Sequence, residues 1–377
     1  MPFPDCVPEL TDGVVRLRAH RLDDVDGIVE QSVDPESLRW TTIPSPYAEL
    51  QARDFLDRIE QQWNADPVEP HWAVCAADDP DGRYLGTIDL RRRGGSLAAV
   101  GYGLCPEGRG RHLMSGALRL VVRWWFDTQA GTRITWTAFG GNLASWAVAR
   151  SAGFRFDTVQ SGCATFRTGE ITDEWHGSID AGEPAGPRAP WFDPPVLEGH
   201  GIRLRPWRDE DGAAVEPPRH PSHFVPEAGI PTPSTFPAWL ARRRLSLARG
   251  VGLNWCIADS VTDRALGDVC VFVHAGALAP GGEAEFGYLV FPSARGRGVG
   301  AAAAQLAVRH ALTPVAPGDL TGRSGLGVRR LVAVTAADND ASNRILERAG
   351  FTVWGREGAA EAPDASVGPA LHWEVLA

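Results

Sequence analysis

The stretch Glu285-Phe-Gly-Tyr-Leu-Val-Phe-Pro-Ser-Ala-Arg-Gly-Arg-Gly-Val-Gly300 decides the fold. Residues 286–291 are aromatic or branched and apolar, which predicts a buried strand, and Pro292 ends that strand because it lacks an N–H donor. Residues 295–300 form a glycine-rich turn, and residues 301–311 read as a helix. Alternating glycines let backbone N–H groups approach an anion, and the helix start adds partial positive charge. The stretch therefore predicts a phosphate site.

The spacing of this turn separates it from two other phosphate loops. A P-loop requires Lys and then Ser or Thr after its last glycine, whereas Val299-Gly300-Ala301 follows here. The dinucleotide fingerprint G-x-G-x-x-G does not fit Gly296-Arg-Gly-Val-Gly300, and the turn comes late in its half of the chain. The sequence has no lysine, which excludes lysine-based covalent catalysis.

Length and composition indicate two ordinary globular domains. The chain has 377 residues, of which 44% are hydrophobic and 22% charged, and its formal net charge is -10. This acidic balance argues against a broad nucleic-acid surface. The six cysteines are scattered without a C-x-x-C pair, so we expect no metal site. No apolar run approaches a membrane span and the N-terminus lacks signal-peptide features, so we expect a cytoplasmic protein without membrane contact.

One pattern occurs twice along the chain. Arg16-Leu-Arg18 and Arg203-Leu-Arg205 each open a strand that an acidic helix start follows. Later, Asn142 precedes Gly153 by eleven positions, and Asn339 precedes Gly350 by the same distance. The repetition indicates an internal duplication. We expect domains at residues 1–180 and 195–377, joined by a Pro/Gly-rich linker at residues 181–194.

Strand, proline, Arg/Gly turn and helix, followed by Asn-x-x-Ser and Ala-Gly-Phe, resembles the GNAT superfamily of N-acetyltransferases. Arg295, Gly298 and Gly300 occupy the three defining places of its acyl-CoA loop, Arg/Gln-x-x-Gly-x-Gly/Ala. The segment around Trp40 and Pro44 is similar to the branch that acetylates ribosomal-protein N-termini (RimJ/RimL-like). The resemblance implies an α/β (α+β) fold with two tandem domains. Each is a mixed, mostly antiparallel sheet with splayed central strands and helices on both faces.

The resemblance also implies a site and a reaction, the transfer of an acetyl or other acyl group from acyl-CoA to an amine. Glu285 is our candidate for the general base that deprotonates the amine. The superfamily often has a tyrosine, as general acid, seven residues after the Asn, but Leu346 stands there. The positions expected to hold the acyl-CoA are Tyr288, Leu289, Val290, Phe291, Arg295, Gly296, Arg297, Gly298, Val299, Gly300, Asn339 and Ser342.

The two halves differ at the loop. In the first half Arg109 is kept, but His112 and Met114 replace the two glycines, and Ala99 stands where the second half has Glu285. We expect these side chains to hinder approach of a pyrophosphate and to resist a positive φ. The resemblance therefore implies that the C-terminal half binds the acyl donor and that the N-terminal half is a degenerate copy.

Several alternatives stay open at this stage. The acceptor is a small-molecule or peptide amine, and the acyl donor is either free CoA or, in natural-product assembly, a carrier protein or an aminoacyl-tRNA. The tRNA version needs Arg clusters such as residues 91–93 and 242–244 to converge, whereas such clusters are more often solvated surface. A non-catalytic protein that binds acyl-CoA or a metabolite is an alternative of another class. The Pro/Gly insertion at residues 313–328 is either a loop over the site or extra length that the fold tolerates. The tandem arrangement of two domains favours a monomer, with a dimer as the alternative.

Overall fold

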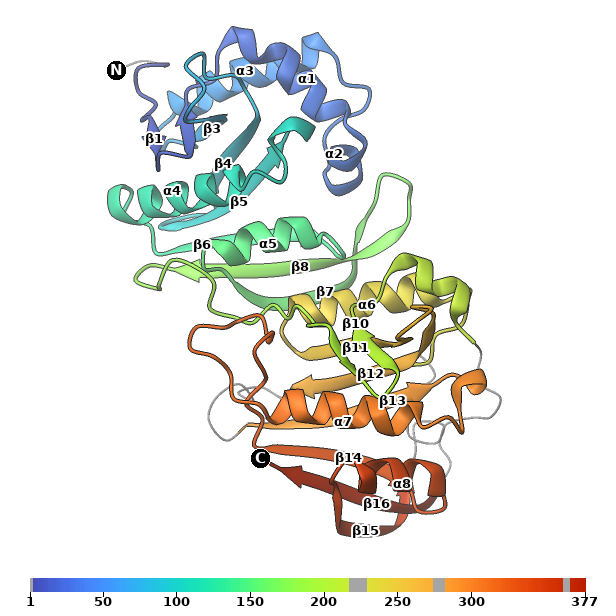
Figure 1. The fold of residues 1–377 in the computed structure, drawn as a ribbon. Helices are drawn as coiled ribbons and strands as arrows, with labels where there is room; N and C mark the ends of the chain where they lie inside the picture. The colour runs from blue at the N-terminus through green and yellow to red at the C-terminus, as the bar shows by residue number, and fades with distance from the viewer. Residues whose placement is uncertain (1–2, 217–228, 274–281, 362–366) are drawn as a thin grey trace. The chain divides into compact units, whose positions relative to one another are not determined.

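The computed structural model describes residues 3–216, 229–273, 282–361 and 367–377 (Figure 1). The chain divides into two compact units, Met1–Arg188 and Ala189–Ala377, each built around one eight-stranded sheet. This confirms the tandem α/β architecture that the resemblance implies. Within the described ranges, none of the helices combines the length and the apolar character that a membrane crossing needs.

The first unit begins with two short strands, followed by three helices and then three strands. Its strands are β1 Leu10–Thr11, β2 Val15–Arg18, β3 His71–Ala76, β4 Gly86–Arg92, β5 Leu97–Leu104, β6 Arg133–Phe139, β7 Arg155–Thr165 and β8 Ile171–Asp180. Its helices are α1 Val25–Val33, α2 Pro35–Trp40, α3 Glu49–Trp63, α4 Leu113–Thr128 and α5 Leu143–Ser151.

In the residues that the structure describes, the second unit repeats the same series with fewer helices before its central strands. Its strands are β9 Leu197–Gly199, β10 Ile202–Arg205, β11 Gly252–Asp259, β12 Ala265–Val273, β13 Glu283–Val290, β14 Arg330–Ala336, β15 Thr352–Glu361 and β16 Val367–Leu376. Its described helices are α6 Phe236–Ala248, α7 Val299–Leu312 and α8 Asp340–Arg348.

The central strands of each sheet separate at one place. The second sheet has the order β9-β10-β11-β12-β13-β14-β16-β15, which repeats the first, and β13 is antiparallel to β12 but parallel to β14. The parallel pairing covers only Glu283–Glu285 against Arg330–Val332, after which the two strands diverge. We call this divergence the fork. The first unit has its own fork after Ala99, where β5 leaves β6. The splayed strands that the resemblance implies are confirmed.

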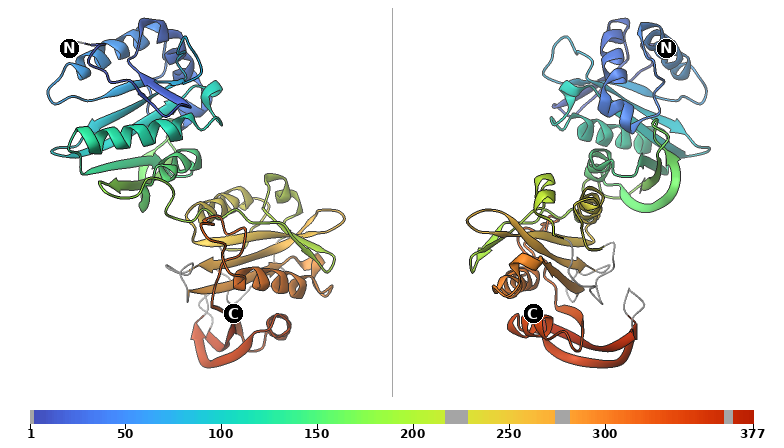
Figure 2. Two further views of the ribbon diagram at one scale, coloured as in Figure 1. Left: turned by 60° about the vertical axis from the view of Figure 1, so that its left-hand side comes forward. Right: turned by 90° about the vertical axis from the view of Figure 1, so that its right-hand side faces the viewer.

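Alternation along the strands of the second unit directs side chains to two different helix layers. Phe286 on β13 and Trp255 on β11 belong to the core under α7, whereas Cys256 and Leu289 pack with Trp239 of α6. The helices α6 and α7 therefore cover opposite faces of the sheet, as Figure 2 shows. Any ligand that passes through the fork meets both layers.

The insertion at residues 313–328 packs onto its own unit. The N–H of Trp191 donates to the carbonyl of Leu320 at 2.9 Å, and the N–H of Asp193 donates to that of Thr321 at 2.8 Å. His310 Nε2 is 2.8 Å from the carbonyl oxygen of Gly322. These bonds tie the insertion to the beginning of the unit and to the end of α7.

Two buried histidines give the first unit a pH-dependent stability. Burial lowers the pKa of His20 well below its ordinary value and also lowers the pKa of His71, although the charge of Asp89 raises the latter. Both rings pack edge-on against Phe55. The unfolded state therefore binds more protons below about pH 6.5, so acid favours unfolding by up to about 1.4 kcal/mol per histidine at pH 5.5.

We expect the variant H20Q/H71N to lose less stability than the natural protein between pH 7.5 and pH 5.5. The second unit supports the change at residue 71, because it carries buried Asn254 next to Trp255, as His71 stands next to Trp72. Thermal unfolding of both proteins at the two pH values measures the effect. An equal loss in both proteins would show that other groups govern the acid response.

Candidate functional site

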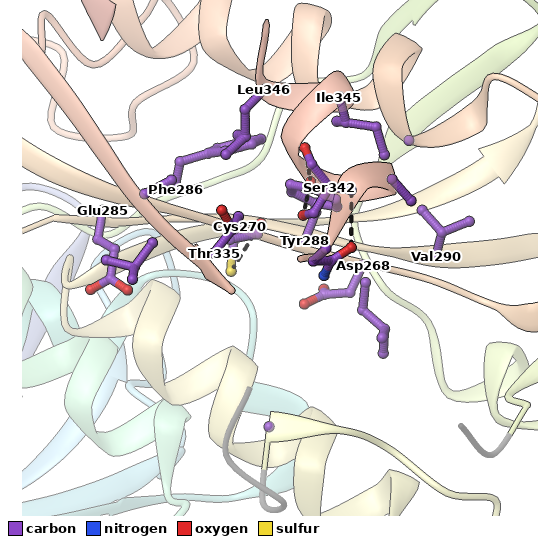
Figure 3. A pocket seen from close by; sticks show the side chains of 18 of the residues that line it. Asp268, Cys270, Glu285, Phe286, Tyr288, Val290, Thr335, Ser342, Ile345 and Leu346 are labelled. Atoms are coloured by element: carbon purple, nitrogen blue, oxygen red, sulfur yellow. Dashed lines mark hydrogen bonds between the residues drawn. The ribbon is translucent and has the colours of Figure 1, made fainter. Parts of the chain in front are cut away.

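The fork of the second unit lies in a pocket of about 1320 Å³. Residues of α6 and β12 line it on one face of the sheet, and residues of α7 and α8 line it on the other. Figure 3 shows both groups, with Glu285 and Asp268 at different ends of one face and Ser342 and Ile345 on the opposite side. None of the described residues that line this pocket belongs to the insertion at residues 313–328. The insertion therefore does not form a loop that covers this site.

The glycine turn forms the end of the pocket nearest α7. Gly296 and Gly298 have φ of 73° and 80°, a conformation that side chains oppose, and Gly298 is the N-cap residue of α7. A Cβ added at either glycine would meet no atom within 4 Å. Open space therefore lies above backbone N–H groups at a helix start, which is the arrangement that an anion needs.

Gly300 serves packing rather than an unusual backbone angle. A Cβ at this position would lie 2.8 Å from Ile345 Cδ1 and 3.2 Å from Val290 Cγ2. The glycine therefore lets α7 approach α8 and β13 closely. In the first unit the equivalent Met114 is buried, so its side chain occupies the core and does not point at an anion.

The other expected loop residues are placed unequally. Arg295 lines the pocket, and its Nε–H donates to the carbonyl of Val290 at 3.1 Å. Arg297 points elsewhere, with its guanidinium 3.9 Å from the Asp259 carboxylate, and it does not line the pocket. Phe291 is buried against the α6 layer and is also outside the lining.

Asn339 and Ser342 act first as structural residues. The Asn339 side chain caps α8 by accepting the N–H of Ser342 at 3.1 Å, and Asn142 accepts the N–H of Ser145 at 3.0 Å in the first unit. The Tyr288 hydroxyl contacts the Ser342 hydroxyl and lies 3.2 Å from its carbonyl. Both residues line the pocket, but the capping is common to both units.

Glu285 stands directly at the fork. It is the last residue of β13 that pairs with β14, and it lies opposite Phe272 of β12 on the α6 face. Its side chain is exposed and lines the pocket, and no hydrogen bond or ion pair holds it among the described residues. A carboxylate in this position is accessible to an amine that enters the fork from the α6 face.

A buried ion pair in the α6 wall was not predicted from the sequence. Asp268 Oδ2 accepts a hydrogen bond from Arg243 Nη2 at 2.6 Å, and its Oδ1 accepts one from Trp207 Nε1 at 2.9 Å. Burial raises the pKa of Asp268 above its ordinary value, against the opposing effects of Arg243 and Trp207. Arg243 belongs to the cluster at residues 242–244, and the interpretation of that cluster as solvated surface is wrong for this side chain, which is 15% exposed.

Among the described residues of the pocket lining the one cysteine is Cys270, and it is not a ready nucleophile. Burial raises the pKa of its thiol to about 12, although the charge of Arg243 acts in the opposite direction. It is therefore protonated at neutral pH. Across the described ranges, no three His, Cys, Asp or Glu side chains come together in a way that could hold a metal ion.

The corresponding loop of the first unit has a similar backbone and different surroundings. His112, the N-cap of α4, has φ of 59°, so the expectation that its side chain resists this conformation is wrong; histidine tolerates it better than most residues. The Arg109 guanidinium pairs with Asp34 and donates to the Leu104 carbonyl at 3.2 Å. Although burial opposes ionisation, the bond from Arg109 holds the pKa of Asp34 below its ordinary value.

The fork of the first unit has different side chains around it. Ala99 ends its parallel pairing, so this fork has no carboxylate at the place of Glu285. A Cβ at Gly101, the equivalent of Gly287, would lie 2.5 Å from Arg91 Nη2 and 2.6 Å from Asp89 Oδ2. The charged side chains of β4 therefore lie against this glycine, where the second unit has Cys270 and Phe272 beside Gly287.

Comparison with protein families identifies both units. The acetyltransferase (GNAT) domain matches residues 15–155 and 202–352, together more than half of the chain. A search of curated proteins finds no significant match.

Three solved structures each match less than half of the chain. A GNAT-family acetyltransferase from Bacillus anthracis is 17% identical and covers 46% of this chain and 98% of its own, with a TM-score of 0.41. A putative ribosomal-protein-serine acetyltransferase from Vibrio cholerae is 17% identical and covers 48% and 99%, with a TM-score of 0.39. RimL, described as a ribosomal L7/L12 α-N-protein acetyltransferase in complex with coenzyme A, is 15% identical and covers 44% and 94%, with a TM-score of 0.40. On the strength of its two domain matches, the chain belongs to the GNAT acetyltransferase family, enzymes that transfer an acyl group from acyl-CoA.

Proposed function

We propose that the second unit binds acyl-CoA and transfers the acyl group to the amine of a small molecule or peptide, while the first unit does not bind the acyl donor. One observation carries the proposal. In the second unit the open glycine turn, the fork and Glu285 meet in one pocket. In the first unit Asp34 neutralises the loop arginine, Ala99 stands in place of Glu285, and Asp89 and Arg91 lie against Gly101 at the fork.

The residues of the second unit divide the binding of the acyl donor between them. Backbone N–H groups at residues 296–300 suit the pyrophosphate, because the glycines leave the helix start uncovered. The edge of β13 beyond Glu285 is unpaired by β14 and suits the amide-containing arm of CoA, which can bond there as an added strand does. Arg295 contributes positive charge beside the same turn.

Glu285 is suited to prepare the amine. It accepts a proton from the ammonium form, directly or through a water, and the neutral nitrogen then attacks the thioester carbonyl carbon. A C–N bond forms and the C–S bond breaks. The nitrogen releases its second proton to solvent, and the leaving thiolate takes a proton from solvent. Leu346 is fully buried and offers no acid, and burial raises the pKa of Tyr288 to about 12 while Ser342 engages its hydroxyl.

Calorimetry and a thiol-release assay test this proposal on the full chain. We expect one acetyl-CoA to bind per chain, and we expect a panel of small amines and short peptides to contain acceptors that release CoA thiol. Two acetyl-CoA molecules per chain would contradict the assignment to one unit. No binding at all would exclude free acetyl-CoA, and carrier-protein thioesters and aminoacyl-tRNA would then be tested as acyl donors.

A further inference from the structure

The α6 wall of the pocket contains an ionic group that the proposed chemistry does not use. The Arg243 guanidinium lies over two aromatic rings. Its Cζ is 4.8 Å from the ring centroid of Trp239 and 5.8 Å from the ring centroid of Phe272. Its Nη2 donates to Asp268, whereas its Nε–H is buried without a hydrogen-bond partner among the described residues. A buried donor without a partner is costly, and this one belongs to a residue that lines the pocket.

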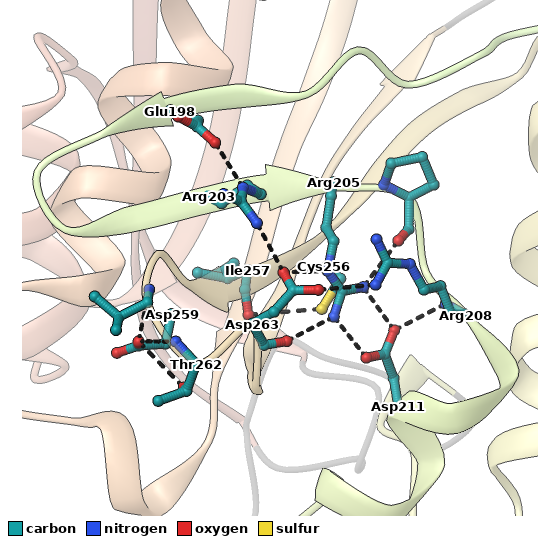
Figure 4. Close-up of polar contacts among 12 residues, drawn as sticks. Glu198, Arg203, Arg205, Arg208, Asp211, Cys256, Ile257, Asp259, Thr262 and Asp263 are labelled. Atoms are coloured by element: carbon teal, nitrogen blue, oxygen red, sulfur yellow. Dashed lines mark hydrogen bonds and ion pairs between the residues drawn. The ribbon is translucent and has the colours of Figure 1, made fainter.

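The duplication provides an internal control for the role of this ion pair. Each unit has a buried clamp between an arginine and an aspartate six residues later, and Figure 4 shows the one in the second unit. Arg205 donates to both carboxylate oxygens of Asp211 at 2.8 and 2.7 Å, and Arg18 donates to those of Asp24 at 2.8 and 2.6 Å. The clamps fix which positions of the two units are equivalent.

Two residues beyond each clamp arginine, a ring nitrogen bonds to the second strand that follows, β12 or β4. In the second unit Trp207 Nε1 donates to Asp268 at 2.9 Å, and in the first His20 Nε2 is 3.2 Å from Thr87 Oγ1. Thr87 and Asp268 each follow the glycine that opposes the last residue of the fork strand, Leu104 or Val290. The first unit therefore has a neutral hydroxyl in place of the buried carboxylate.

The first unit also has an apolar residue at the position of Arg243. Trp239 packs edge-on against Trp207 at 5.1 Å, and Phe55 packs in the same way against His20 at 6.0 Å. Four residues further along these helices stand Arg243 and the fully buried Ile59. The fold is therefore built without the ion pair in the first unit. Since a buried ion pair rarely stabilises a fold more than apolar residues do, the fold alone does not explain its presence beside the pocket.

We propose that Arg243 binds the carboxylate of the acceptor, so that the acceptor is an amine that also carries a carboxylate, as amino acids do. This deepens the proposed function and rests on it. Arg243 is the accessible member of the pair, with 15% of its side chain exposed against 4% for Asp268, whose two oxygens already accept hydrogen bonds. An anion is therefore recognised in preference to a cation. The charge of Asp268 beside the guanidinium favours a single negative charge over a phosphate dianion.

The position of Glu285 agrees with such an acceptor. Glu285 lies directly opposite Phe272 in the sheet, and Arg243 contacts the ring of Phe272. A carboxylate for the ammonium group and a guanidinium for the carboxylate thus both lie next to one aromatic residue. An acceptor with both charges matches this order, whereas a simple amine leaves Arg243 unused.

The test uses a variant that copies the first unit, R243I/D268T, because removing Arg243 alone would leave Asp268 buried and unpaired. Acceptors are the common α-amino acids, β-alanine, γ-aminobutyrate and dipeptides, each beside its uncharged amide. We expect the natural enzyme to prefer the acids by about 10- to 100-fold in kcat/KM, the size of a charge-assisted hydrogen bond. We expect the variant to lose this preference, through KM, and R243K to retain part of it.

Calorimetry with acetyl-CoA on the same variant separates the role of Arg243 from the proposed function. We expect R243I/D268T to bind acetyl-CoA with unchanged affinity. Equal use of acids and amides by the natural enzyme, an unaltered preference in the variant, or no binding of any acid would each overturn the role of Arg243. If the natural protein binds no acetyl-CoA, the proposed function fails by itself. Calorimetry with the amino acids alone, on the natural protein and on R243I/D268T, then still decides whether Arg243 binds a carboxylate.

Discussion

Replacing Gly298 with Trp is expected to weaken acetyl-CoA binding by at least about 100-fold, or about 2.7 kcal/mol. Gly298 caps α7 with φ of 80°, and a side chain there projects into space free of protein atoms. An indole in that space would cover the N–H groups that we assign to the pyrophosphate. Calorimetric titration of acetyl-CoA into G298W and into the natural protein measures the change.

The chain offers a matched control for this variant. His112 is the N-cap of α4 and has a left-handed backbone, as Gly298 does at α7, so H112W places the same side chain at the equivalent point of the first unit. We expect H112W to bind acetyl-CoA as the natural protein does. G298A adds the strain of a side chain at positive φ without the bulk, and its smaller loss of affinity separates strain from obstruction. Loss of binding in H112W, with G298W unaffected, would place the acyl donor in the first unit.

The fold and the loop could be predicted because their signals are local in the sequence. The strand, proline, glycine turn and helix follow one another without interruption, and the duplication shows the same series twice. The helix cap at Asn339 is equally local, since it bonds three residues along the chain. Gly300 was recognised as a required glycine, but its reason, contact with Ile345 of another helix, needs the tertiary packing.

The residues that we assign to the acceptor could not be predicted, because only the tertiary packing brings them together. Asp268 and Arg243 are 25 positions apart and come from a strand and a helix whose packing no short motif encodes. An arginine in a run of three also looks like solvated surface, because the sequence does not show which member faces the sheet. In the first unit, Asp34 reaches Arg109 from a distant helix start, so the loop sequence alone could not show that its charge is neutralised.

Replacing Glu285 with Gln is expected to lower kcat by about 100-fold or more, with acetyl-CoA affinity unchanged, because a positioned general base contributes that much. Glu285 is exposed at the fork and opposite Phe272, so the substitution removes a charge without leaving a buried group unpaired. Without the base, only acceptor that is already deprotonated reacts. The rate of E285Q should therefore rise with pH up to the pKa of the acceptor amine. The rate of the natural enzyme should reach its plateau at a lower pH, because Glu285 deprotonates the bound amine.

Glu283 provides the control for this last experiment, because it is the same residue type two positions earlier on β13. It pairs with Arg330 at 2.6 Å and does not line the pocket. We expect E283Q to keep its kcat and pH profile and to lose at most a little stability. If E285Q also kept both, Glu285 would be a solvated carboxylate, and deprotonation of the amine would fall to water. A loss in E285Q alone requires the carboxylate at the fork, because the two variants remove the same charge from the same strand.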